Sequence, residues 1–176
     1  MFSISSPLIS MRSSIFRQSN RLFSQYAKNE QIFLHSIEGT TIASLSKDPK
    51  ATSLGTVTGS TAAIVPTNFK TNPTFVSILH ETVSKTIQND FSFIVEAGAN
   101  ANTYMPIYDF RHTPNYGRIP EVDNIFGYVQ VDAEGKIVPG TYESNNLYRL
   151  CNGESGIIKL SDFLYSEVQK ACENSS

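Results

Sequence analysis

The chain has 176 residues, of which 40% are hydrophobic and 17% are charged. This length suits one domain with a core of its own, and the low charged fraction excludes a chain that stays disordered in solution. The longest apolar runs are far shorter than the roughly 20 residues that cross a bilayer. The sequence therefore predicts a folded chain that is not membrane-spanning.

Charged residues are distributed unevenly along the sequence. All 16 acidic residues lie at or after Glu30, whereas Arg12, Arg17 and Arg21 precede it. Without those three arginines, 11 basic residues stand against 16 acidic ones, a net charge of −5. Contact with phosphate backbones needs clustered lysine and arginine, so we expect no nucleic-acid partner.

Residues 1–29 have the composition of a targeting segment. They contain seven serines before Ser24, three arginines and no acidic residue, with hydrophobic residues dispersed among them. This is typical of a mitochondrial transit peptide, whereas a secretory signal has one continuous apolar run. Arg21 lies three residues before Ser24, a spacing that resembles matrix-processing sites. We predict a transit peptide over residues 1–23, disorder to about residue 29 and a location in the mitochondrial matrix. The alternative is a disordered tail that targets nothing.

Short strand patterns dominate the rest of the chain. Most are runs of four to eight apolar and β-branched residues that end at Gly, Pro, Asn or Asp. We expect strands at about 31–38, 41–45, 56–58, 62–65, 91–95, 104–110, 125–131, 136–138, 146–151 and 157–160.

Two segments have helical periodicity instead. The first, about 73–88, follows the cap signal Asn72-Pro73, and the second, about 162–172, follows the cap residue Ser161. Each has one apolar stripe at spacings of three and four residues, formed by Phe75, Ile78, Leu79, Val83 and Ile87 in the first and by Leu164, Val168, Ala171 and Cys172 in the second.

These elements predict a fold class. Many short strands joined by tight turns, with only two helices, favour an α+β domain whose sheet is largely antiparallel and is covered by the two amphipathic helices. We expect a single globular domain over residues 30–173. The second helix should lie on the sheet formed around 91–95 and 125–131.

One loop, between Phe110 and Ile125, holds the densest set of functional groups. Two arginines there could clamp an anion, and a histidine beside them could transfer a proton near neutral pH. The candidates are His112 and Asp109 for catalysis and Arg111, Arg118 and Tyr116 for ligand binding. Two alternatives stay open: a partner-binding surface, and structural ion pairs of the arginines with Glu121, Asp123 or Glu96.

Sequence motifs for catalysis or metal binding are missing. The chain has no GxSxG, GxxxxGK[ST], GxGxxG, HExxH or EF-hand pattern. Cys151 and Cys172 have no metal-ligand spacing, and His35, His80 and His112 are far apart. We expect two buried thiols, no metal and no cofactor.

Two functions are compatible with these patterns. The first is a non-enzymatic mitochondrial matrix protein that binds another mitochondrial protein, as an accessory or assembly factor for the respiratory or translation machinery. The compartment alone suggests those two machineries. The alternative is a small enzyme or binding protein for an anionic metabolite, using the loop with Arg111, His112 and Arg118. The oligomeric state stays open.

Overall fold

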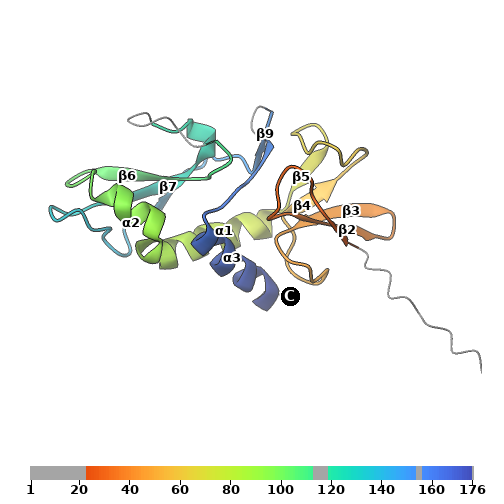
Figure 1. Ribbon diagram of the computed structural model, residues 1–176, viewed down its shortest axis with the longest axis horizontal. Coiled ribbons are helices and arrows are strands. Elements are labelled where there is room, and N and C mark those ends of the chain that lie inside the picture. The colour runs from red at the N-terminus through yellow and green to blue at the C-terminus, as the bar shows by residue number, and fades with distance from the viewer. Residues whose placement is uncertain (1–22, 113–118, 154–155, 176) are drawn as a thin grey trace, which may run out of the picture.

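A computed structural model describes residues 23–112, 119–153 and 156–175. The fold is α+β with antiparallel strand pairing, so the predicted class is confirmed. The molecule is elongated, with one sheet toward each end and helix α1 running between them (Figure 1). One continuous hydrophobic cluster contains buried residues from both sheets and from the helices.

The N-terminal sheet has five strands in sequence order, each antiparallel to the next. The turn between the second and third strands has positive φ at Glu38 and Gly39, as a two-residue hairpin requires. The predicted hairpin over 31–45 is therefore present. The strands are β1 (Phe23–Gln25), β2 (Phe33–Ile37), β3 (Thr40–Ser44), β4 (Gly55–Val57) and β5 (Phe69–Thr71).

The folded part begins earlier than the predicted disorder to about residue 29 allows. Strand β1 pairs with β2, and Tyr26 and Asn29 are buried. Asn29 donates a hydrogen bond of 2.8 Å to the carbonyl of Ile158, which lies 129 residues away in sequence. A partner so distant cannot be recognised from local composition, which is why this expectation was wrong. Residues 1–22, which carry most of the predicted transit peptide, lie outside the described residues.

Helix α1 (Pro73–Thr86) confirms the first predicted helix. Asn72 caps it by accepting a hydrogen bond from the Thr74 amide, and a 3₁₀ turn, η1 (Ile87–Asn89), continues it. The predicted stripe is the buried face, since Phe75, Leu79, Val83 and Ile87 are all buried.

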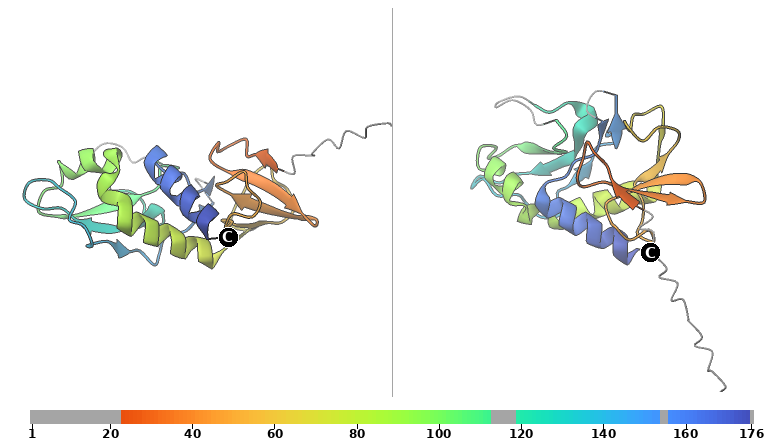
Figure 2. Two further views of the ribbon diagram at one scale, coloured as in Figure 1. Left: turned by 90° about the horizontal axis from the view of Figure 1, so that it is seen from below. Right: turned by 45° about the vertical axis from the view of Figure 1, so that its right-hand side comes forward.

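Helix α3 (Asp162–Asn174) confirms the second predicted helix, with Leu164, Val168 and Cys172 buried. Its docking differs from the prediction. Helices α1 and α3 contact each other and lie side by side in Figure 2. Tyr165 and Gln169 both donate to the carbonyl of Leu45, so α3 spans α1 and the N-terminal sheet.

Helix α2 (Phe91–Ala97) replaces the strand predicted at 91–95. Asp90 caps it by accepting a hydrogen bond from the Ser92 amide. The same buried carboxylate accepts a hydrogen bond from Ser161, the cap residue of α3, so one side chain fixes the starts of two helices. The alternation of Phe91, Phe93 and Val95 suggested a strand, but only Phe93 of these three is buried.

A second sheet has the order β6-β7-β8, and a separate hairpin pairs β9 with β10. Gly127 allows the close approach of β7 and β8, because a Cβ there would lie 2.2 Å from the carbonyl oxygen of Glu143. The elements are β6 (Tyr104–Tyr108), η2 (Val122–Asn124), β7 (Ile125–Gln130), β8 (Glu143–Ser144), β9 (Cys151–Asn152) and β10 (Gly156–Ile157).

Three further predicted strands are shorter or missing. The return strand at 136–138 is reduced to one bridge between Val131 and Ile137. The segment 146–151 is mostly turn, and residues 62–65 form no strand although Ile64 is buried. In each segment a buried apolar residue, Ile137, Leu150 or Ile64, enters the core with little or no strand pairing around it. A hydrophobic pattern alone does not distinguish such a segment from a strand.

Candidate functional site

Three of the five candidate residues lie in the described part of the structure. Asp109 directly follows the end of β6, and Arg111 and His112 come two and three residues after Asp109. Tyr116 and Arg118 fall in residues 113–118, outside the described residues. The loop can therefore be assessed around Asp109, Arg111 and His112.

Arg111 and Asp109 form a buried ion pair. Nε of Arg111 lies 2.9 Å from Oδ2 of Asp109, and the side chains are 2% and 0% exposed. Buried charges are costly to leave unpaired, and a buried guanidinium needs acceptors for all of its N–H groups. The other contacts of Arg111 supply them.

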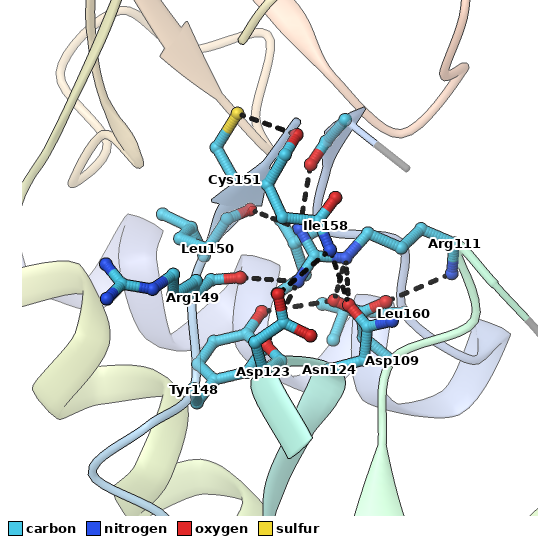
Figure 3. Close-up of polar contacts among 12 residues, drawn as sticks. Asp109, Arg111, Asp123, Asn124, Tyr148, Arg149, Leu150, Cys151, Ile158 and Leu160 are labelled. Carbon is cyan, nitrogen blue, oxygen red and sulfur yellow. Dashed lines mark hydrogen bonds and ion pairs between the residues drawn. The ribbon is translucent and has the colours of Figure 1, made fainter. Parts of the chain in front are cut away.

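The guanidinium of Arg111 donates to acceptors from several distant segments (Figure 3). Nε also donates to Oδ1 of Asn124, at 2.9 Å. The remaining acceptors are main-chain carbonyls: Leu150 at 3.0 Å and Gly156 at 2.8 Å for Nη1, and Asp123 at 3.4 Å and Arg149 for Nη2. One side chain thus joins the end of β6 to η2, to the segment before β9 and to β10.

The Asp109 carboxylate accepts further hydrogen bonds besides its contact with the Arg111 guanidinium. Its Oδ1 accepts from the Arg111 amide at 3.1 Å, and its Oδ2 accepts from the hydroxyl of Tyr148 at 3.3 Å. Burial raises the pKa of the Asp109 carboxyl to about 7, and the neighbouring Arg111 guanidinium works against that rise. Burial also raises the pKa of the Tyr148 hydroxyl well above its ordinary value, which keeps it a donor.

This geometry favours the structural ion-pair alternative for Arg111. All three guanidinium nitrogens have protein acceptors, so none is left to clamp an anion. The partner is Asp109, whereas the sequence suggested Glu121, Asp123 or Glu96. Asp123 contributes its main-chain carbonyl, and Glu96 accepts a hydrogen bond from Tyr108.

His112 is exposed, unlike the buried side chains of Asp109 and Arg111. Among the described residues, no hydrogen bond joins it to Asp109, whose carboxylate instead accepts from Arg111 and Tyr148. Asp109 therefore does not orient the imidazole, which removes the geometric support for a proton-transfer pair.

The two cysteines are buried and free, as predicted. Burial raises the pKa of the Cys151 thiol to about 11 and that of Cys172 to about 12. A nucleophilic cysteine needs a lowered pKa, so both thiols are poor nucleophiles near neutral pH.

Helix α2 carries an exposed apolar surface that was not predicted from the sequence. Phe91, Ile94 and Val95 are 76%, 44% and 61% exposed, and their spacing of three and four residues places them on one side of the helix. We call these three residues the α2 face. The buried side of the same helix carries Phe93 and Ala97. The one sequence signal that could have revealed the helix was the cap residue Asp90.

A hollow of about 420 Å³ lies beside Phe91. The exposed carboxylates of Glu30 and Asp162 contribute to its walls, together with one lysine, Lys159. The surroundings of the α2 face are thus polar and carry more acidic than basic groups.

Comparison of the chain with protein-family models, curated proteins and solved structures finds no significant match. Within residues 23–112, 119–153 and 156–175, no helix is both long and apolar enough to cross a bilayer. No cluster of three histidine, cysteine, aspartate or glutamate side chains suited to a metal ion occurs among those residues either.

Proposed function

We propose that this protein is a non-enzymatic mitochondrial matrix protein that binds another protein through the α2 face, as an accessory or assembly factor. The respiratory and translation machineries are the candidate settings because of the compartment alone. The exposed Phe91, Ile94 and Val95 carry the binding part of this proposal. The composition of residues 1–29 supports the location.

A helical face of this kind fits a recurring mode of recognition. Amphipathic helices bind grooves through apolar side chains at spacings of three and four residues. Phe91 is the natural anchor, because large aromatic side chains dominate binding energies at interface centres. A solvent-exposed phenylalanine contributes little to the fold, so its position on a capped and rigid helix favours a role in contact with a partner.

The charges near the α2 face define the partner further. Glu30 and Asp162 line the hollow beside Phe91, and the chain without its three N-terminal arginines has a net charge of −5. Complementary charges at the rim direct association and select partners. The expected partner is a protein with an apolar groove edged by lysine or arginine.

Affinity isolation from mitochondria tests the binding site. The imported, mature protein should retain a stoichiometric partner that Phe91→Glu and Val95→Glu lose, because a buried unpaired carboxylate opposes docking. Leu147→Glu is the matched control, since Leu147 is 62% exposed, belongs to a turn after β8 and does not line the hollow beside Phe91. Equal recovery with all three variants would contradict the proposal.

Sedimentation of the purified protein tests the choice of occupant. We expect a monomer whose sedimentation does not change with Phe91→Glu. A stable dimer that this variant dissociates would show that a second copy covers the α2 face, and the proposed heterologous partner would then be wrong.

A fluorescent fusion tests the location. Residues 1–29 fused to a fluorescent protein should direct it to mitochondria, because a basic, serine-rich segment without acidic residues is the signal that import machinery recognises. Replacing Arg12, Arg17 and Arg21 with glutamine in the fusion should abolish import. A wild-type fusion that stays cytosolic would refute the location while leaving the binding site untouched.

A further inference from the structure

A cleft of about 330 Å³ is lined by residues from both the N-terminal and the C-terminal part of the chain. Tyr26 and Ile64 from the N-terminal part line one side, and Phe110 and Ile157 from the C-terminal part line the other. A boundary between two parts of a fold is a frequent place for small-molecule sites, and this volume is at the small end of their usual range of roughly 300–1,000 Å³.

Two lysines give the cleft a positive charge. Lys28 and Lys159 both line it, and no acidic residue does so among the residues that the structure describes. Lys85, Lys136 and Lys170 each form an ion pair with a nearby glutamate. Neither Lys28 nor Lys159 has such a partner within the described ranges. In a body with excess acid, two unpaired ammonium groups at one cleft form a local site for a negative charge.

Arg111 also lines the cleft, but its guanidinium is already occupied. Its Nε lies 2.9 Å from Asp109, and its N–H groups donate to Asn124 and to main-chain carbonyls. The lysines are therefore the cationic groups that a ligand would meet. The cleft therefore differs from the anion site predicted from the sequence, in which arginines would hold the anion.

Tyr26 supplies a third polar group. Its hydroxyl oxygen accepts a hydrogen bond of 3.0 Å from the Ile64 amide. Among the described residues, its own proton has no acceptor, although the side chain is buried. A hydroxyl with an unused proton beside a positively charged cleft is suited to donate to an anionic oxygen.

We propose that this cleft binds a small organic anion, with Lys28, Lys159 and the Tyr26 hydroxyl holding its acidic group. Ile64, Ile157 and the half-buried ring of Phe110 pack against its apolar body. The ligand class is a compact molecule with one carboxylate or phosphate on one ring or short apolar chain. Lys159 and Phe110 also line the hollow beside Phe91, but no residue of the α2 face lines the cleft, so this inference does not rest on the proposed function.

Titration of the full-length protein with simple probes tests the site. Phenyl phosphate and benzoate should bind saturably at millimolar concentration, whereas neutral benzyl alcohol should not, because it lacks the charge that the lysines recognise. Inorganic phosphate should bind more weakly than phenyl phosphate, because it leaves the apolar walls empty. Calorimetry or amide chemical shifts measure the affinities. The ratio of the affinities for phenyl phosphate and benzoate shows whether the site prefers a phosphate or a carboxylate.

Matched variants decide whether the cleft is responsible. Lys28→Gln and Lys159→Gln should each weaken phenyl phosphate binding about tenfold, which corresponds to roughly 1.4 kcal/mol. Lys50→Gln is the control, since Lys50 is exposed, lies outside the cleft and forms no ion pair in the described structure. The Lys50 variant should bind as the wild type does.

Two outcomes would overturn the inference: no saturable binding of either anionic probe, or equal weakening by Lys28→Gln and Lys50→Gln. Partner capture through the α2 face should survive Lys28→Gln, because Lys28 does not line the hollow beside Phe91. Failure of the cleft and failure of the proposed function are thus separable.

Discussion

Helices α1 and α2 follow each other along the chain, separated only by a 3₁₀ turn, yet they use their apolar side chains in opposite ways. In α1, Phe75, Leu79 and Val83 are fully buried. In α2, Phe91 and Val95 are among the most exposed apolar side chains of the described structure. Helix α1 buries its hydrophobic surface in the core, whereas α2 leaves much of its own hydrophobic surface in contact with water.

The buried face of α1 contributes to stability, whereas the exposed face of α2 is suited to recognition of a partner. Exposed apolar residues scattered singly are ordinary, whereas several together on one rigid element indicate a contact surface. Helix α2 can keep such a face because its position does not depend on it. Asp90 caps its start, and Phe93 and Ala97 anchor its other side in the core.

The largest expected effect in this comparison comes from α1. Phe75→Ala should destabilise the protein by about 3–5 kcal/mol, since the ring is 0% exposed and its loss leaves a cavity. Denaturant unfolding of the full-length protein followed by circular dichroism measures it. A loss below about 1 kcal/mol would mean that α1 is not packed as the structure places it.

The contrast between the helices also explains which parts of the fold were predictable. For α1, the cap residue Asn72, the following proline and a long apolar stripe all predict the same element. Helix α2 has only seven residues, fewer than two full helical turns, so its apolar stripe is too short to be recognised. Its two phenylalanines, at alternate positions, fit the two-residue period of a strand equally well. Only the exposure of Phe91 and Val95, which depends on tertiary packing, resolves the ambiguity.

The polar composition of the candidate loop could be read from the sequence, but the contacts that its side chains make could not. The density of polar residues around Arg111 suggested specific contacts, but it did not indicate which groups make them. The acceptors that occupy its guanidinium include the carbonyls of Leu150 and Gly156, which lie 39 and 45 residues away. Main-chain carbonyls have no sequence signature, so a pattern of side chains cannot show that an arginine is already satisfied.

The proposed cleft was unpredictable for a related reason. It combines residues near Tyr26, Ile64, Phe110 and Ile157, four stretches that are far apart in sequence. Lys28 moreover lies in a segment that composition assigned to a disordered linker, although its neighbours Tyr26 and Asn29 are buried. Long-range contacts bring these groups together, such as the hydrogen bonds from Asn29 to the Ile158 carbonyl and from Cys151 to the Ile64 carbonyl.

The smallest expected effect on stability, that of Phe91→Ala, is the most direct test of the difference between α1 and α2. Phe91→Ala removes the same side chain as Phe75→Ala, and both positions lie in the first turn of a helix that an asparagine or aspartate side chain caps. Because the Phe91 ring is 76% exposed, its removal should change the free energy of unfolding by less than about 0.5 kcal/mol. Denaturant unfolding of both variants under one set of conditions gives the ratio directly. A loss of 2 kcal/mol or more at Phe91 would mean that other parts of the same chain cover the α2 face in solution. The face would then belong to the core, and its role in binding a partner would have to be abandoned.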